Sequence, residues 1–247
     1  TGNSNVAIGR AAMQSNTGGS GVALGAYALD AQTTGSSNTA IGYQSLSSLT
    51  DANYNTACGH EAGENLTTGD ENTYLGFQAG HGATTGSRNV CVGEGAGKKI
   101  TTGSNNVYVG SDSGSALNDA PAANNTCVGS SAGRAITTGS QNTLIGEAAA
   151  VDCSTGDNNV CLGQDSGRGG ASGNIISSSN NVVLGNSNTA NLYCTDTSIS
   201  SSDSRDKADV TDFTHGLSWI KELRPVTYRW DRRTWYSDDK SVTPDGS

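Results

Sequence analysis

The side chains with types suited to metal binding or acid–base chemistry are few along most of this chain. Hydrolysis of a glycan needs two carboxyl groups facing one groove. Glu61, Glu64 and Glu94 are scattered singly, which favours solvated surface charge over catalysis. His60 and His81 occupy different places in a repeating pattern, so we expect no pair of histidines within the chain. If three copies of the chain assembled around a symmetry axis, three copies of one histidine could meet there, but nothing in the repeating pattern requires such a site.

Calcium-binding β-rolls carry GGxGxD turns in every repeat. Gly-Asp occurs here at Gly69-Asp70 and Gly156-Asp157 without a repeated ladder of carboxylates. We therefore expect no metal ion and no cofactor.

The element that must position these side chains is a repeat of 17 residues, which is clearest over residues 72–105 (NTYLGFQAGHGATTGSR, then NVCVGEGAGKKITTGSN). Eleven copies are present, and they start at Asn5, Gly21, Asn38, Asn55, Asn72, Asn89, Asn106, Asn125, Asn142, Asn159 and Asn181. The residue at each start is position 1. A fixed period in this range predicts a solenoid with one copy per rung. The copies that depart from the period, at 116–124 and 169–180, predict loops that bulge from the rod.

Composition and charge support this architecture and exclude some partners. The chain has 34 Gly in 247 residues and only 5% aromatic residues, which suits thin stacked rungs better than a globular core. Residues 1–201 carry 6 Lys and Arg against 14 Asp and Glu. This acidity argues against nucleic acid and anionic membrane as partners. No apolar run approaches the roughly 20 residues of a membrane span, so we expect no membrane insertion.

Each copy opens with a short strand. Position 2 is always Val or Thr, and position 4 is aliphatic except at Cys58, so we predict that these two positions face the solenoid interior. Position 3 is variable but apolar, and we predict that it faces outward, toward a subunit interface. Position 5 is Gly in every copy, which predicts a corner with positive φ. We also expect small residues at position 8 to form a second wall, Thr-Thr-Gly to form the return turn, and the asparagines at position 1 to stack as an amide ladder.

Six cysteines are present, and none forms a CxxC pair. Cys91, Cys127 and Cys161 share position 3 and recur every second rung. Rungs stack about 4.8 Å apart, so their sulfurs would lie roughly 10 Å apart, too far for a disulfide. We interpret them as small buried apolar residues.

The repeat resembles the heads of trimeric autotransporter adhesins. It is even more similar to the NTAIGYQAG-type repeats of phage tail fibres, as Asn38-Thr39-Ala40-Ile41-Gly42-Tyr43-Gln44 shows. The resemblance covers about residues 5–191. It implies a trimeric, left-handed parallel β-roll with an adhesive or structural role. The predicted fold is therefore an all-β parallel β-solenoid of about eleven rungs in a homotrimer, with a small α+β segment at the C-terminal end.

The composition changes after the last repeat. We predict a β-solenoid over 1–192, a Ser/Thr-rich linker over 193–201 and a separate segment over 202–247, which holds all 3 tryptophans. In that segment Phe213–Leu223 has the spacing of an amphipathic helix and Val226–Trp230 the alternation of a strand.

This segment resembles the start of the intramolecular chaperone, or peptidase S74, domain. The similarity rests on Ser202-Asp203-Ser204-Arg205-Asp206-Lys207 and on the string LRPVTYRW at 223–230. Asp206 and Asp209 depart from the residues usual in the family. The resemblance implies that the domain trimerises the fibre and then cuts itself off between Ser201 and Ser202.

By the same resemblance, Ser202 is the nucleophile and Lys207 its base. A lysine can accept the serine proton if burial or a nearby positive charge such as Arg205 lowers its pKa. Residues five apart face opposite sides of a regular strand, so the chain must bend here or the pair must form between subunits. Any enzymatic activity would be this single self-cleavage, with no external substrate.

These observations predict a structural and receptor-binding component of a phage tail fibre, located in the virion. Its partners would be two further copies of itself, a bacterial surface glycan or other host receptor, and other fibre or baseplate proteins. The alternative is a bacterial cell-surface or extracellular fibril or adhesin. A polysaccharide depolymerase is the less favoured third reading.

Overall fold

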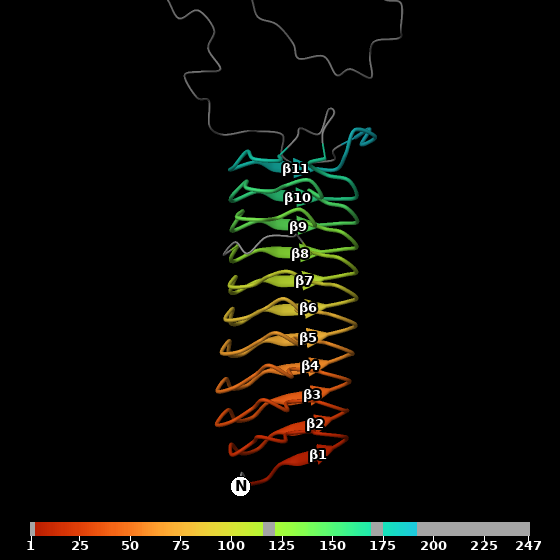
Figure 1. The fold of residues 1–247 in the computed structure, drawn as a ribbon. Helices are drawn as coiled ribbons and strands as arrows, with labels where there is room; N and C mark the ends of the chain where they lie inside the picture. Colours follow the sequence, from red (N-terminus) through yellow and green to blue (C-terminus); the bar gives the residue numbers. More distant parts are fainter. Residues whose placement is uncertain (1–2, 116–121, 169–174, 192–247) are drawn as a thin grey trace, which may run out of the picture. The chain divides into compact units, whose positions relative to one another are not determined.

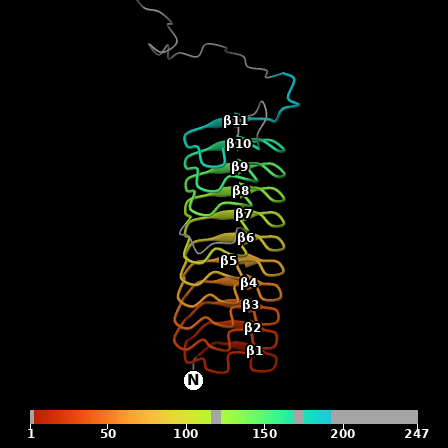
Figure 2. The ribbon, with the colours of Figure 1, turned by 45° about the horizontal axis from the view of Figure 1, so that its top comes forward.

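The computed structural model describes residues 3–115, 122–168 and 175–191, and within these ranges the chain forms a parallel β-solenoid (Figures 1 and 2). Each rung contributes one strand of three residues. The strands are β1 (Val6–Ile8), β2 (Val22–Leu24), β3 (Thr39–Ile41), β4 (Thr56–Cys58), β5 (Thr73–Leu75), β6 (Val90–Val92), β7 (Val107–Val109), β8 (Thr126–Val128), β9 (Thr143–Ile145), β10 (Val160–Leu162) and β11 (Val182–Leu184). They pair in chain order in a single sheet, which confirms the predicted solenoid.

The register follows the repeat without a slip. Thr56 of β4 pairs with Thr73 of β5, and Cys58 pairs with Leu75. The longer connections before β8 and β11 leave this register unchanged, because Val107 still pairs with Thr126 and Val160 with Val182. Each repeat position therefore forms a column along the rod, so a property shared by one position becomes a continuous stripe.

The predicted orientation of the strands is wrong. Position 3 faces the interior, and from β2 to β10 its side chains are at most 1% exposed. Positions 2 and 4 face outward instead: Ile8 is 59% exposed and Leu24 is 43% exposed. Since a strand of three residues presents one side chain to one face and two to the other, apolar residues on both faces leave the orientation undetermined.

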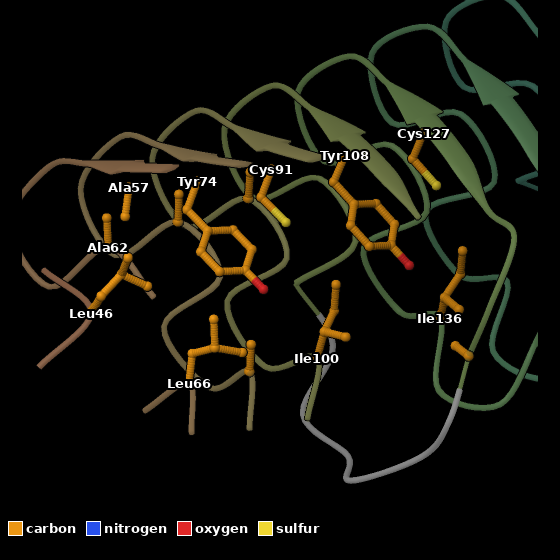
Figure 3. Close-up of a cluster of buried hydrophobic side chains, with 14 of the residues drawn as sticks. Leu46, Ala57, Ala62, Leu66, Tyr74, Cys91, Ile100, Tyr108, Cys127 and Ile136 are labelled. Carbon is orange, nitrogen blue, oxygen red and sulfur yellow. The ribbon is translucent and has the colours of Figure 1, made fainter. Parts of the chain in front are cut away.

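The interior holds position 3 because its side chains match those of position 9 across the narrow coil. Ala40 is followed by Leu46 in its rung, whereas Tyr74 is followed by Gly80. A Cβ added at Gly80 would lie 2.4 Å from the Tyr74 ring. Figure 3 shows Tyr74, Cys91 and Tyr108 pointing from their strands into this shared interior. Large and small residues alternate in this way to keep the cross-section filled.

The buried small residues at position 8 and the glycine corner at position 5 confirm the predictions made for these positions. Ala62, Ala79 and Ala96 at position 8 are completely buried, as is Leu66 at position 12. The glycines at position 5 have positive φ, for example +148° at Gly59. A Cβ at Gly59 would lie 2.2 Å from the carbonyl oxygen of Gly76, so the corner requires glycine both for its conformation and for the close approach of the next rung.

The asparagines at position 1 form the predicted ladder inside the rod. Oδ1 of Asn72 accepts hydrogen bonds from the backbone N–H of Asn89 at 2.9 Å and from its Nδ2 at 3.1 Å. Nδ2 of Asn89 also donates to the carbonyl oxygen of Gly103 at 2.8 Å. The pattern repeats from Asn38 to Asn181, and it satisfies the amides that would otherwise be costly to bury.

Several expectations fall outside the described residues. The bulging loops predicted at 116–124 and 169–180 fall mostly on 116–121 and 169–174, and the linker, the helix and the strand predicted after residue 192 also lie outside. Within the described ranges, no helix has the length and hydropathy of a membrane span.

Candidate interaction surfaces

The outward side chains of positions 2 and 4 make a stripe that we call the apolar face, and it runs along β1–β11. Its exposed members include Leu75 at 37%, Ile145 at 42% and Val182 at 70%. The residues between them are aliphatic or threonine, and Cys58 is also exposed. Isolated apolar residues on a surface are ordinary, but a continuous apolar stripe of this length is a candidate interaction surface.

A second stripe lies one or two residues after the corner glycines, and we call it the aromatic column. It contains Tyr27, Tyr43, His60 and Phe77. Ring centroids are 6.1 Å apart for Tyr27 and Tyr43, 5.0 Å for Tyr43 and His60, and 5.6 Å for His60 and Phe77. The guanidinium of Arg10 lies over the Tyr27 ring, 5.3 Å from its centroid. Phe77 remains 47% exposed, so the column offers apolar ring surface to solvent.

The tight turns of two neighbouring rungs bring together Glu61, Glu64 and His81, which we call the histidine–glutamate cluster. One ligand atom from each lies within 4.8 Å of the others. Nε2 of His81 is 3.0 Å from Oε2 of Glu64. The sequence-based interpretation of Glu61 and Glu64 as single, scattered charges is therefore wrong for this pair, whereas Glu94 stays apart as an exposed residue.

His60 and His81 do not form a pair with each other in the structure, as predicted. His60 faces Glu61, with Nδ1 3.5 Å from Oε1, and stacks in the aromatic column. What the sequence analysis missed is that Glu64 and His81 share position 10 of consecutive rungs. That signal was present in the repeat, because residues 17 apart lie one above the other.

The cysteines at position 3 behave as buried apolar side chains, as expected. Cys91, Cys127 and Cys161 are completely buried and free, and Cys153 is also buried. Burial raises the pKa of the Cys91 and Cys127 thiols well above the ordinary value, and burial, with a smaller contribution from Cys153, raises the pKa of Cys161 to about 11. Such thiols react poorly, since the thiolate is the nucleophile.

Ser202 and Lys207 lie outside the described residues, so their geometry is not part of this structure. The segment that contains them matches a protein family: residues 202–245 fit the family model Peptidase_S74, described as chaperone of endosialidase. No curated protein and no solved structure matches the chain. The resemblance seen in the sequence is thus confirmed for this segment.

A β-solenoid followed by a chaperone-of-endosialidase segment indicates a protein of the phage tail-fibre or endosialidase-like type.

Proposed function

We propose that this protein is a structural and receptor-binding component of a phage tail fibre, whose solenoids associate as a homotrimer. The observation that carries the proposal is the apolar face, which spans every rung and precedes a segment of the chaperone-of-endosialidase family. The trimer is the stoichiometry that the chaperone-of-endosialidase match implies, and the apolar face supports it as the surface through which three rods would pack.

The proposed packing of three rods follows from which side chains a single rung can bury. A rung of 17 residues closes its own interior with the side chains of positions 3, 8, 9 and 12, so the aliphatic residues at position 4 stay outside. Three copies around an axis would remove Leu75, Ile145 and their equivalents from water. Burial of apolar area is worth about 25 cal/mol per Å², and the contribution is repeated at each rung.

The test introduces charge into this face. Leu75→Glu with Ile145→Glu should convert the trimer to monomer in light scattering after size exclusion, because six carboxylates would have to be buried in the assembly. Thr68→Glu with Thr138→Glu is the matched control, since both threonines are exposed at the return turn. The trimer should survive that change. A wild-type monomer, or a trimer unaffected by the two charges in the apolar face, would contradict the proposal.

The C-terminal segment would drive assembly and then leave by cleavage between Ser201 and Ser202. The support is the family match that begins at residue 202. In this proposal the Ser202 hydroxyl attacks the carbonyl carbon of Ser201 while Lys207 takes the hydroxyl proton. Lys207 would return that proton to the Ser202 nitrogen as the Ser201–Ser202 amide bond breaks, and water would then hydrolyse the ester between Ser201 and the Ser202 hydroxyl.

Intact mass measurement of the full-length protein tests the pair. Ser202→Ala and Lys207→Ala should each leave only the uncut chain, whereas Ser201→Ala and Lys221→Ala, the neighbouring residues of the same types, should still cut. Cleavage that persists at the same bond in both Ser202→Ala and Lys207→Ala would refute the assignment.

Receptor binding would use the aromatic column. The C–H faces of sugar rings pack on exposed aromatic rings, and the polar side chains beside them, such as Gln44 and Gln78, can bond hydroxyl groups. Tyr43→Ala with Phe77→Ala should reduce binding to host surface glycan about tenfold or more. Ser111→Ala with Ser130→Ala, at the same position of rungs that contribute no ring to the aromatic column, should leave it unchanged. Equal binding by both double variants would place the receptor site elsewhere.

The alternative is a bacterial cell-surface or extracellular fibril built from the same repeats, which a secretion signal or membrane anchor elsewhere in the parent protein would favour. A depolymerase is less favoured. It would require glycan cleavage that Glu61→Gln or Glu64→Gln abolishes.

A further inference from the structure

We propose that Glu61, Glu64 and His81 form a binding site for a divalent transition metal ion, with Zn²⁺ as the ion that fits the donors best. The site lies on the turns that follow β4 and β5, outside the apolar face and beside the aromatic column. It does not depend on the proposed fibre function.

The solenoid places the three side chains by its period. Glu64 and His81 hold position 10 of consecutive rungs, and the backbone N–H of Asn65 donates to the carbonyl oxygen of His81 at 3.2 Å, which ties the two turns together. Asn65 Nδ2 donates to the same oxygen at 2.9 Å. Glu61 precedes Glu64 by one tight turn, closed by the Glu64 N–H to Glu61 carbonyl bond at 3.4 Å. The backbone of the site is therefore fixed before any ion binds.

The donor set and spacing suit zinc. Zinc binds imidazole nitrogen and carboxylate oxygen with bonds of about 2.0–2.2 Å, and a zinc site with three protein ligands can hold water in the fourth place. Tetrahedral bonds of this length put ligand atoms about 3.3 Å apart. The 3.0 Å between His81 Nε2 and Glu64 Oε2 is slightly shorter than this separation, so a small side-chain movement would admit the ion. The ligand oxygen of Glu61 lies within 4.8 Å of the ligand atoms of Glu64 and His81. Rotation of the flexible Glu61 side chain would bring this oxygen to bonding distance of the ion.

The charges around the cluster also favour a cation. Among the residues that the structure describes, Glu61 and Glu64 have no Lys or Arg ion-pair partner. Each is about one-fifth exposed, so two like charges are held close together with limited solvation. The second oxygen of Glu61 accepts a hydrogen bond from Gln78 Nε2 at 2.6 Å, which orients the carboxylate as outer-shell groups do in metal sites.

Metal binding requires one tautomer of the His81 ring. Without an ion, His81 Nε2 lies 3.0 Å from Glu64 Oε2. With Zn²⁺ present, the neutral ring holds its proton on Nδ1, and Nε2 presents a lone pair to the ion. The ion would then bridge two rungs through His81 and Glu64, whose side chains otherwise meet in this one contact.

Titration of the full chain with ZnCl₂ after removal of metal tests the site. Calorimetry should give one Zn²⁺ per chain at this site, and the unfolding temperature should rise with zinc concentration because the ion binds only the folded turns. Glu64→Gln and His81→Gln should each weaken binding by roughly tenfold or more, and the zinc-dependent rise in unfolding temperature should be lost.

Glu94→Gln is the matched control, since Glu94 is an exposed carboxylate outside the cluster, and this change should leave the affinity unchanged. Binding that is lost in His60→Gln but kept in His81→Gln would overturn the assignment. One ion per three chains would also overturn it, because that stoichiometry belongs to a shared axis. Zinc bound by other parts of the chain would be unaffected by Glu64→Gln, and if all binding is of that kind, the proposal is wrong.

Discussion

At the scale of single residues, the interior is specified by pairs of side chains from positions 3 and 9. Position 9 has a left-handed backbone whichever residue it holds, with φ of 51° at Leu46 and 61° at Gly80. Glycine is therefore present at Gly80 for space as much as for conformation, because Tyr74 occupies the volume that a side chain there would need. In the rung of β3, Ala40 leaves that volume free and Leu46 fills it.

This pairing predicts a rescue. Gly80→Leu alone should destabilise the fold by about 3 kcal/mol through overpacking, and Tyr74→Ala alone should cost about 3–5 kcal/mol through the cavity it leaves. The double variant reproduces the Ala40 and Leu46 arrangement and should recover at least about 1 kcal/mol of the summed loss. Denaturant unfolding of the four proteins measures the coupling. Strict additivity would show that the two side chains do not share a volume.

At the scale of the element, a rung is held to the next one by backbone bonds of its strand and by the buried asparagine. Asn89 uses its whole amide: Oδ1 accepts from the N–H of Asn106 at 3.1 Å and from its Nδ2 at 3.0 Å, while Nδ2 donates to Asn72 and Gly103. No other side chain of similar size supplies two donors and an acceptor at this place.

The ladder therefore predicts a large effect of a small change. Asn89→Asp removes both donors and turns a carboxylate oxygen toward the Gly103 carbonyl, so it should cost about 2–4 kcal/mol of unfolding free energy. Asn105→Asp is the control, since Asn105 is exposed and its Oδ1 accepts a hydrogen bond from Arg88 that an aspartate keeps. Thermal and denaturant unfolding should separate the two. Equal stability of both variants would remove the ladder from the stabilising interactions.

At the scale of the whole molecule, the described chain is a rod with one surface that it cannot bury by itself. Within the described residues, Cys58 is the free cysteine that lies on the apolar face, whereas Cys91, Cys127, Cys153 and Cys161 lie in the interior. The four interior thiols therefore report on burial inside the solenoid, and Cys58 reports on whether another molecule covers the apolar face.

Thiol labelling with peptide mapping should show this difference. In the native assembly at pH 8, all five thiols should resist a maleimide. The interior thiols should resist because burial shields them and raises the pKa of Cys91, Cys127 and Cys161. Cys58 should resist because a second chain would cover it. In the monomeric Leu75→Glu, Ile145→Glu protein, Cys58 should react and the interior thiols should not. Fast labelling of Cys58 in the native protein would show that the apolar face is open.

The sequence by itself determined the period, the strand in each copy, the glycine corner, the asparagine ladder and the family of the C-terminal segment. These features depend on residues at fixed local spacing, such as Asn72 and Gly76, whose roles follow from backbone geometry. Only the tertiary structure decided which face of the strand is inside, because Val90, Cys91 and Val92 are all apolar and the choice depends on the side chains across the coil. It also brought His81 to Glu61 and Glu64, since stacking of rungs joins residues that local spacing keeps apart.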